Sequence, residues 1–225
     1  MIDTKILWQS IPQITTGMVT TLELMICALI IGLLLALLLT MCSYLNLKII
    51  NLILKTYTFI IRGTPLLVQI FIIYYGSSQF DFIRNGILWN ILKEPFACAV
   101  IALALNTSAY SFELFRGAIN AIPYGEIEAC QALGLSKLQM LRKVIAPRAI
   151  RLVLPAYSNE VIIILKSTTL ASTITLMDIM GVIHAFISQT YLTASYLLLA
   201  GSIYLFLNLI IINIFRYIEG RLSYQ

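Results

Sequence analysis

The chain has 225 residues, of which 60% are hydrophobic and only 11% are charged, and its mean hydropathy is +0.93. A water-soluble fold does not need this much apolar surface, so the composition excludes that class and predicts an all-α integral membrane protein. The formal net charge of +5 would suggest a nucleic acid partner in a soluble domain. In a membrane protein it bears on orientation instead, and no nucleic acid partner is expected.

Apolar runs along the chain predict five membrane-spanning helices in a single transmembrane domain, residues 1–225. Four runs are uncharged and reach the ~18 residues that a helix needs to cross the hydrocarbon. They cover residues 24–47, 63–80, 95–112 and 185–215, and a fifth, 152–177, is interrupted by Glu160 and Lys166. We expect the first span at 17–43, after a segment 1–16 that lies at the outer interface with Trp8 at headgroup level.

The basic residues predict the orientation of these spans. With the amino terminus outside, only Lys5, Arg84 and Lys93 lie outside, and Lys166 lies within a span. The positive-inside rule therefore favours an external amino terminus and a cytoplasmic carboxyl terminus. Eleven basic residues are then cytoplasmic: Lys48, Lys55, Arg62, Arg116, Lys137, Arg142, Lys143, Arg148, Arg151, Arg216 and Arg221. The first three recur every seven residues, so a helix would present them as one stripe to anionic lipid headgroups.

The second span begins with GTPLLVQIFIIYYG, in which polar residues surround a break. Gly63 ends the preceding helix, Thr64 is expected to cap a new helix, and Pro65 to occupy its first turn. The free backbone N–H groups of such a helix start would meet an anionic substrate group, with Gln69 one turn further on. The alternative is a simple start of the span at the cytoplasmic surface.

The third span has a polar face. Asn106, Tyr110 and Glu113 are spaced i, i+4 and i+7, and Ser108 lies on an adjoining face. This is too much polarity for a lipid-facing helix, so the face is predicted to line a pathway or to bond a neighbouring helix. Glu113 is expected to pair with Arg116, three residues on.

Glu160 falls near the middle of the fourth span. A charge at that depth costs about 2.5–3.5 kcal/mol on insertion scales, so the side chain should face the protein interior or a water-filled cavity. It is a candidate contact for a cationic substrate, and the alternative is a structural pair with a basic side chain of the assembly. Lys166, six positions later, lies well off the face of Glu160 and is not expected to pair with it.

The longest polar interval contains EIEACQALGLSKLQ, residues 126–139. Residues 125–133 favour helix, Gly134 suits the left-handed turn that closes it, and Ser136 would cap a second helix after Leu135. Two short helices joined by a glycine bend are therefore predicted.

Motifs of catalysis are absent. The sequence has no Gly-Lys dipeptide and hence no Walker A loop, and it shows no catalytic or metal-binding motif. The four cysteines have no paired short spacing and are interpreted as small hydrophobes, and the single histidine, His184, as an ordinary loop residue. We therefore expect a transport subunit without catalytic residues, metal ligands or cofactors of its own.

The segment EIEACQALGLSKLQMLRKVIAP, residues 126–147, resembles the cytoplasmic loop of importer-type ATP-binding-cassette permeases, in which Glu-Ala-Ala is followed by glycine and Ile-x-Leu-Pro at fixed distances. Glu128, Ala129, Gly134 and Pro147 match in identity and spacing, whereas Cys130, Val144 and Ala146 are conservative departures. FIIRGTPLLVQIFIIYYG, ALNTSAYSFELFRGAINAIPYGEIEA and LPAYSNEVIIILKSTTLASTITLMDI resemble the polar amino acid permeases, especially those for arginine, with the histidine/lysine/ornithine permeases near by.

The resemblance implies a type I importer permease of the bacterial inner membrane that pairs with a second permease, homologous or identical. Two partner ATPases would bind ATP and Mg²⁺, and a periplasmic binding protein would deliver the amino acid. The coupling loop, residues 126–147, would dock on the ATPase through Glu128, Ala129, Gly134, Leu135 and Ser136. The substrate would contact Glu160, Asn106, Tyr110, Thr64, Gln69 and Ser108. A channel or proton-coupled carrier with Glu113, Glu160 and Lys166 as a relay is the alternative of a different class.

Overall fold

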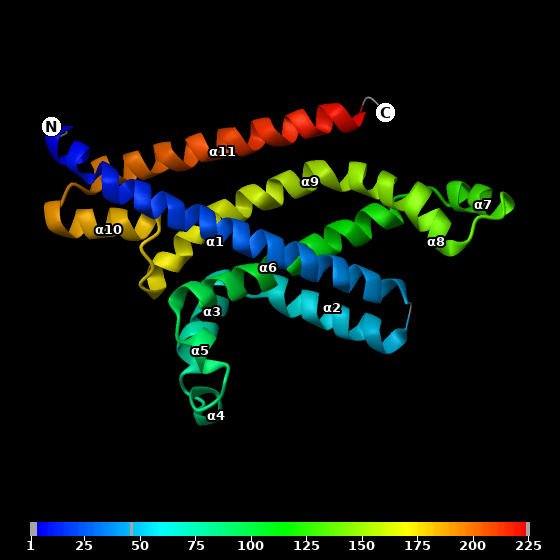
Figure 1. The fold of residues 1–225 in the computed structure, drawn as a ribbon, viewed down its shortest axis with the longest axis horizontal. Helices are drawn as coiled ribbons and strands as arrows, with labels where there is room; N and C mark the ends of the chain where they lie inside the picture. Colours follow the sequence, from blue (N-terminus) through cyan, green and yellow to red (C-terminus); the bar gives the residue numbers. More distant parts are fainter. Residues whose placement is uncertain (1–3, 46, 224–225) are drawn as a thin grey trace.

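The computed structural model describes residues 4–45 and 47–223, and the side chains of residues 10–45 and 47–221. This part of the chain is all helical. The long helices are α1 (Thr4–Tyr44), α2 (Lys48–Gly63), α6 (Pro95–Asn120), α9 (Ala146–Ser167) and α11 (Thr193–Ser223). They run alongside one another, with the amino terminus and α10 (Ile179–Thr190) at one end (Figure 1). The carboxyl terminus lies toward the other end, where α7 (Tyr124–Ala132) and α8 (Lys137–Met140) project.

Three helices are long and apolar enough to cross a membrane by themselves, namely α1, α6 and α11. Two further spans result if each of two bent helix pairs is counted as one span. The first pair joins α2 to residues 66–76 and is bent by 103°, and the second joins residues 137–174 to α10 and is bent by 50°. The predicted number of five is therefore reached only with two broken spans.

Several predicted boundaries are wrong because helices continue across or stop within the apolar runs. Helix α1 passes without interruption through the predicted boundary at residue 17 and carries Pro12 inside it, so residues 4–16 are not a separate interfacial segment. The side chain of Trp8 lies outside the described residues. The run 185–215 contains two helices, because α10 ends at Tyr191 in the left-handed conformation.

The second predicted span is also not a straight helix. After the break come α3 (Leu66–Phe71), a π-helical turn (Ile72–Gly76) and the short helices α4 (Asp81–Arg84) and α5 (Trp89–Leu92). These segments project sideways from the long helices (Figure 1). Helix α2 runs beside α1 and α6, and its basic residues Lys48, Lys55 and Arg62 are exposed.

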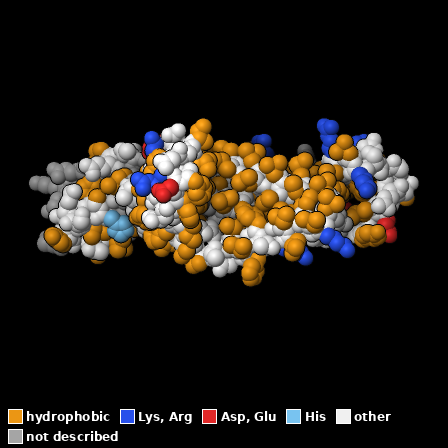
Figure 2. Space-filling view, turned by 90° about the horizontal axis from the view of Figure 1, so that it is seen from below, with side chains coloured by type: hydrophobic (Ala, Val, Ile, Leu, Met, Phe, Trp, Pro, Cys, Tyr) orange, Lys and Arg blue, Asp and Glu red, His pale blue; other side chains and the backbone are white. Residues whose placement is uncertain are grey.

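Small residues allow α1 and α6 to pack closely. Buried alanines lie along both helices, and a Cβ atom added to Gly32 of α1 would come within 2.2 Å of Cγ2 of Thr107 on α6. Without a hydrophobic drive between helices in lipid, such close contact supplies the attraction. Large apolar side chains cover the outside of the bundle between its charged groups (Figure 2). This distribution is typical of a surface that faces lipid.

Candidate functional site

Glu160 lies in the middle of α9 with only 4% of its surface exposed. Its Oε1 has no hydrogen-bond partner among the described residues. The hydroxyls of Thr107 and Ser111, one turn apart on α6, are buried and unpartnered as well. Thr107 on α6 and Arg62 on α2 lie near the Glu160 carboxylate. The predicted interior position of Glu160 is thus confirmed, at a place where three helices supply polar groups.

Tyr110 and Arg62 form a second part of the site. The guanidinium carbon of Arg62 lies 5.1 Å from the centre of the Tyr110 ring, which is cation–π geometry. Both residues line a cavity of about 510 Å³ that also reaches Glu113 and Arg116. Glu113 and Arg116 pair at 2.6 Å, as predicted from their spacing. Arg62 has no ion-pair partner within the described part of the chain, so its charge is available to a ligand.

Thr64, Gln69 and Asn106 form one hydrogen-bond network across the 103° break. Gln69 Nε2 donates to the carbonyl oxygen of Ile61 at 2.7 Å, to that of Thr64 at 3.2 Å and to Thr64 Oγ1 at 2.9 Å. Asn106 Nδ2 donates to Gln69 Oε1 at 3.3 Å. The network holds the end of α2 against α3 and α6.

The predicted cap at Thr64 is wrong. Its hydroxyl donates back to the carbonyl of Ile60 at 2.8 Å, and Pro65 is the N-cap residue of α3, without a side-chain cap bond. The reason is that the Gln69 side chain, rather than Thr64, bonds the free carbonyl groups at the break. Thr64 and Gln69 therefore bond to each other across the break.

Ser108 bonds to a residue outside the predicted site. Its hydroxyl lies 2.6 Å from that of Tyr57 on α2 and 2.9 Å from the carbonyl oxygen of Leu105, and the residue is fully buried. The structure thus places Ser108 in the packing between α2 and α6. It brings Glu160 and Tyr110 into one region with Arg62 and Thr107.

The coupling loop, residues 126–147, has the predicted two-helix architecture. Gly134 has a φ of +71°, and its N–H and that of Leu135 donate to the carbonyls of Gln131 and Cys130, at 2.9 and 3.1 Å. This pair of bonds is a Schellman motif, which terminates α7. Ser136 Oγ then accepts from Gln139 N–H, and Gln139 Oε1 accepts from Ser136 N–H, which is a capping box.

Two further contacts fix the coupling loop to the bundle. Arg148 Nη2 of α9 lies 3.0 Å from Glu126 Oε1 of α7, and a small core around Cys130, Met140 and Ile145 is buried beneath the bend. Leu133 and Leu138 are instead 79% and 73% exposed, and Glu128 and Ala129 are exposed as well. The loop therefore presents apolar side chains outward on a rigid frame.

Residues 28–224 match the family described as binding-protein-dependent transport system inner membrane component. The chain belongs to this family. An octopine transport system permease protein from Rhizobium radiobacter is 43% identical over 98% of this chain and 90% of its own length. The arginine ABC transporter permease protein of Haemophilus influenzae is 43% identical over 92% of this chain and 91% of its own length. The histidine/lysine/arginine/ornithine transport system permease protein of Salmonella typhimurium is 40% identical over 92% of this chain and 88% of its own length.

The fold of the permease agrees with solved structures. A crystal structure of an amino acid ABC transporter with histidines superposes with a TM-score of 0.88 at 32% identity, over 98% of this chain and 99% of that one. A structure of the methionine transporter MetNI superposes with a TM-score of 0.67 at 18% identity, which shows a shared fold. The predicted type I permease fold, the amino acid ABC permease family and the inner-membrane location are thereby confirmed. In this family the ATPase is a separate subunit.

Two residues of the permease site were missed by the sequence predictions, Thr107 and Arg62. Thr107 lies next to Asn106 and is spaced i, i+4 with Ser111, so it belongs to the polar pattern of α6, but it was not assigned to the predicted substrate contacts. Arg62 was interpreted only as part of a lipid-facing stripe. Its contact with Tyr110 depends on the path of α2 after residue 48, which the local sequence does not define.

Proposed function

We propose that this permease carries a basic amino acid, arginine in the first place, from a periplasmic binding protein into the cytoplasm. Two partner ATPases, which bind ATP and Mg²⁺, drive the transport, and this chain itself performs no catalysis. The observation that carries the proposal is the buried carboxylate of Glu160 with an oxygen that has no partner among the described residues. Named relatives for arginine and for histidine, lysine, arginine and ornithine support it.

A guanidinium group is a suitable partner for the unpartnered oxygen of Glu160. Two parallel N–H···O bonds to one carboxylate add directionality to charge attraction, and both are strengthened where water is excluded. A neutral side chain without donors would leave the unpartnered oxygen of the buried carboxylate without a hydrogen bond, which is costly. A lysine, ornithine or histidine side chain would supply charge without the planar fork. We therefore rank arginine above those three as the substrate.

An amino acid also brings a carboxylate, and Arg62 is the matching cation. Its positive charge lies near the Glu160 carboxylate. Its guanidinium lies over the Tyr110 ring and has no ion-pair partner among the described side chains. Arg62 takes the role that the sequence assigned to the helix start at Thr64. Asn106, Tyr110 and Thr107 form the wall on α6 between the two charged ends, while Gln69 and Thr64 hold its shape.

The coupling loop transmits motion from the ATPase. Exposed Leu133 and Leu138 fit an apolar groove on a partner, and the loop continues directly into α9, which carries Glu160. Displacement of a rigid loop would tilt α9 relative to α6 and open the site to one side at a time. Glu128, Ala129, Gly134, Leu135 and Ser136 make up this docking part.

The assembly pairs this permease with a second one, homologous or identical, on the two ATPases. The amino terminus lies outside, the carboxyl terminus and the coupling loop face the cytoplasm, and the five spans form one domain, residues 1–225. The chain ends lie at opposite ends of the bundle, and the carboxyl terminus shares an end with the coupling loop (Figure 1), which fits this orientation.

Substitution Glu160→Gln in the purified complex tests the proposal. We expect the Kd for radiolabelled arginine to rise about 10- to 100-fold, because a buried charge-assisted hydrogen bond is lost, while competition by neutral citrulline changes little. Glu23→Gln, which removes an exposed carboxylate from α1, is the control and should bind as the wild type does. Unchanged arginine affinity in Glu160→Gln would refute the substrate assignment. Proton-driven uptake by the permease without ATPase would instead favour a carrier.

A further inference from the structure

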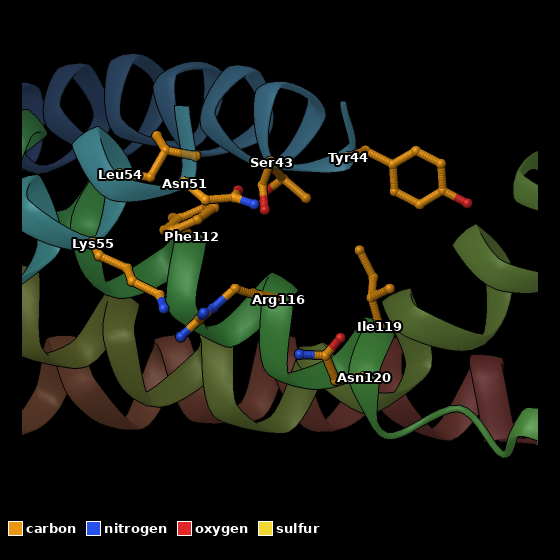
Figure 3. Close-up of a pocket in the computed structure, with 10 residues that line it drawn as sticks. Ser43, Tyr44, Asn51, Leu54, Lys55, Phe112, Arg116, Ile119 and Asn120 are labelled. Atoms are coloured by element: carbon orange, nitrogen blue, oxygen red, sulfur yellow. The ribbon is translucent and has the colours of Figure 1, made fainter. Parts of the chain in front are cut away.

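A cavity of about 390 Å³ opens at one end of the bundle, between the last turns of α1, the middle of α2 and the end of α6 (Figure 3). Leu54 and Phe112 are buried beneath it, with 6% and 2% of their surface exposed. Polar side chains surround the opening. The ten lining residues are Thr40, Ser43, Tyr44, Asn51, Leu54, Lys55, Phe112, Arg116, Ile119 and Asn120.

Lys55 and Arg116 are the charged residues among the described ones that line this cavity, and Figure 3 shows their cationic groups directed toward each other from α2 and α6. Arg116 is paired with Glu113, but Lys55 has no ion-pair partner in the described part of the chain. Because Glu113 offsets only one of the two facing cations, an anion between them would pair with Lys55 and gain a second charge-assisted contact from Arg116.

The surroundings of the opening are apolar on one side. Tyr44, Met41 and Leu37 are spaced i, i−3 and i−7 on α1, so they lie on one face of the helix. Their exposed fractions are 48%, 69% and 46%. An exposed apolar strip thus leads from the rim of the cavity along α1 toward the middle of its apolar length. A ligand that covers both features is anionic at one end and hydrocarbon at the other.

The position of the cavity along the helices leads us to infer that it lies at the depth of lipid headgroups. It is formed by the ends of two apolar spans, and Tyr44 at its rim is an aromatic residue of the type that collects at membrane interfaces. Hydroxyl and amide groups from Ser43 and Asn120 provide further hydrogen-bond donors for a polar headgroup. A soluble anion would use the cations but would leave the apolar strip uncovered.

We propose that this cavity binds the phosphate of an anionic phospholipid, held between Lys55 and Arg116, with an acyl chain along Tyr44, Met41 and Leu37. Because the bound headgroup contacts α1, α2 and α6 together, it fixes α2 against the bundle. Arg62 lies on the same helix, two turns beyond Lys55, so the lipid also steadies the position of Arg62. The proposal does not depend on which amino acid is carried.

The test compares the complex in nanodiscs of phosphatidylcholine with and without a minor fraction of phosphatidylglycerol. We expect phosphatidylglycerol to raise the melting temperature of the wild type and to remain bound in native mass spectrometry. In Lys55→Gln the affinity should fall about fivefold, the effect of one cation at a membrane surface. Lys48→Gln, an exposed lysine two turns away on α2 that does not line the cavity, should retain the wild-type response.

Four outcomes would overturn the proposal. An equal loss in Lys48→Gln would show a diffuse attraction to the surface, and a melting temperature of Lys55→Gln lowered equally in pure phosphatidylcholine would show a structural role. If inorganic phosphate in detergent stabilised the complex as well and displaced phosphatidylglycerol, the site would be for a soluble anion. If Lys55→Gln released the ATPase without changing lipid retention, the cation would contact that partner. Lys55→Arg, which keeps the charge, should retain lipid and controls for misfolding.

Discussion

The side chains of Asn106 and Gln69 join α6 to α3 through a hydrogen bond of 3.3 Å, while the other end of the Gln69 amide donates to the end of α2. One amide group thus spans three helices at the point where the chain turns by 103°. Gln69 is 9% exposed, so water does not replace these contacts readily. The direction of α2, and with it the place of Arg62, depends on this residue.

Substitution Gln69→Leu should therefore lower the stability of the permease markedly. It leaves the carbonyl of Ile61 and the amide of Asn106 without partners, and each buried unsatisfied group costs about 1–3 kcal/mol. We expect a lower melting temperature and reduced arginine uptake. The matched control is Gln79→Leu, at an exposed position beyond the π-helical turn, which should behave as the wild type. Equal stability of the two variants would contradict the bridging role of Gln69.

Close packing of α1 on α6 gives a second prediction. In Gly32→Ala the new methyl group meets Thr107 Cγ2 at 2.2 Å and the Ala104 carbonyl at 3.1 Å, so the helices must separate or Thr107 must move. Overpacking of this kind costs about 1–3 kcal/mol. We expect a lower melting temperature, and we expect weaker arginine binding because Thr107 lies near the Glu160 carboxylate. Gly201→Ala, where nothing lies within 4 Å, should have no effect, and a silent Gly32→Ala would argue against the close contact.

The left-handed turn at Gly134 gives a third prediction. Space for a side chain is available there, but the backbone conformation disfavours residues other than glycine. No atom lies within 4 Å of a Cβ placed there, so only the φ of +71° opposes a side chain. Gly134→Val should distort the turn at a cost of about 1–2 kcal/mol, whereas Gly134→Asn tolerates this conformation. We expect ATP hydrolysis without matching uptake in the valine variant and coupled transport in the asparagine variant. Coupled transport by both would show that the bend is not needed.

Asp178 caps α10 at the second break and gives a fourth prediction. Its Oδ1 accepts from the Gly181 N–H at 2.9 Å, and Thr21 Oγ1 of α1 accepts from the N–H of Ile179 beside it, at 3.1 Å. Asp178→Ala should destabilise the complex by about 0.5–2 kcal/mol, the usual cost of a lost cap. Asp178→Asn keeps an acceptor oxygen and should melt close to the wild type. Thermal unfolding measures both, and identical losses would indicate that the charge, rather than the cap, is required.

Local patterns predicted the parts of this protein that are built from neighbours in sequence. Gly134, Ser136 and the Glu113–Arg116 pair were all predicted because their partners lie within a few residues. The interior position of Glu160 followed from the cost of charge in a membrane. Family resemblance supplied the transporter class, which composition alone does not define.

Contacts between distant segments were not predicted. Asn106 of α6 bonds Gln69 of α3, and Ser108 of α6 bonds Tyr57 of α2, although these partners are 37 and 51 residues apart. Hydropathy also reports length and not direction, so the break at Gly63 was predicted but its angle of 103° was not, and the run 63–80 was interpreted as one span although it holds only a short helix and a π-helical turn. Helix packing decides these features, and a single sequence does not display it.

The glycine turn, the capping box and the Glu126–Arg148 contact have a consequence for how the motor subunit associates. Because these bonds already order the coupling loop in the lone permease, docking does not carry the entropic cost of ordering it. The heat capacity change of association should then match the apolar area covered at Tyr124, Leu133 and Leu138, without a contribution from coupled folding. Recognition between the two subunits would then depend on the fit of two surfaces that are already ordered.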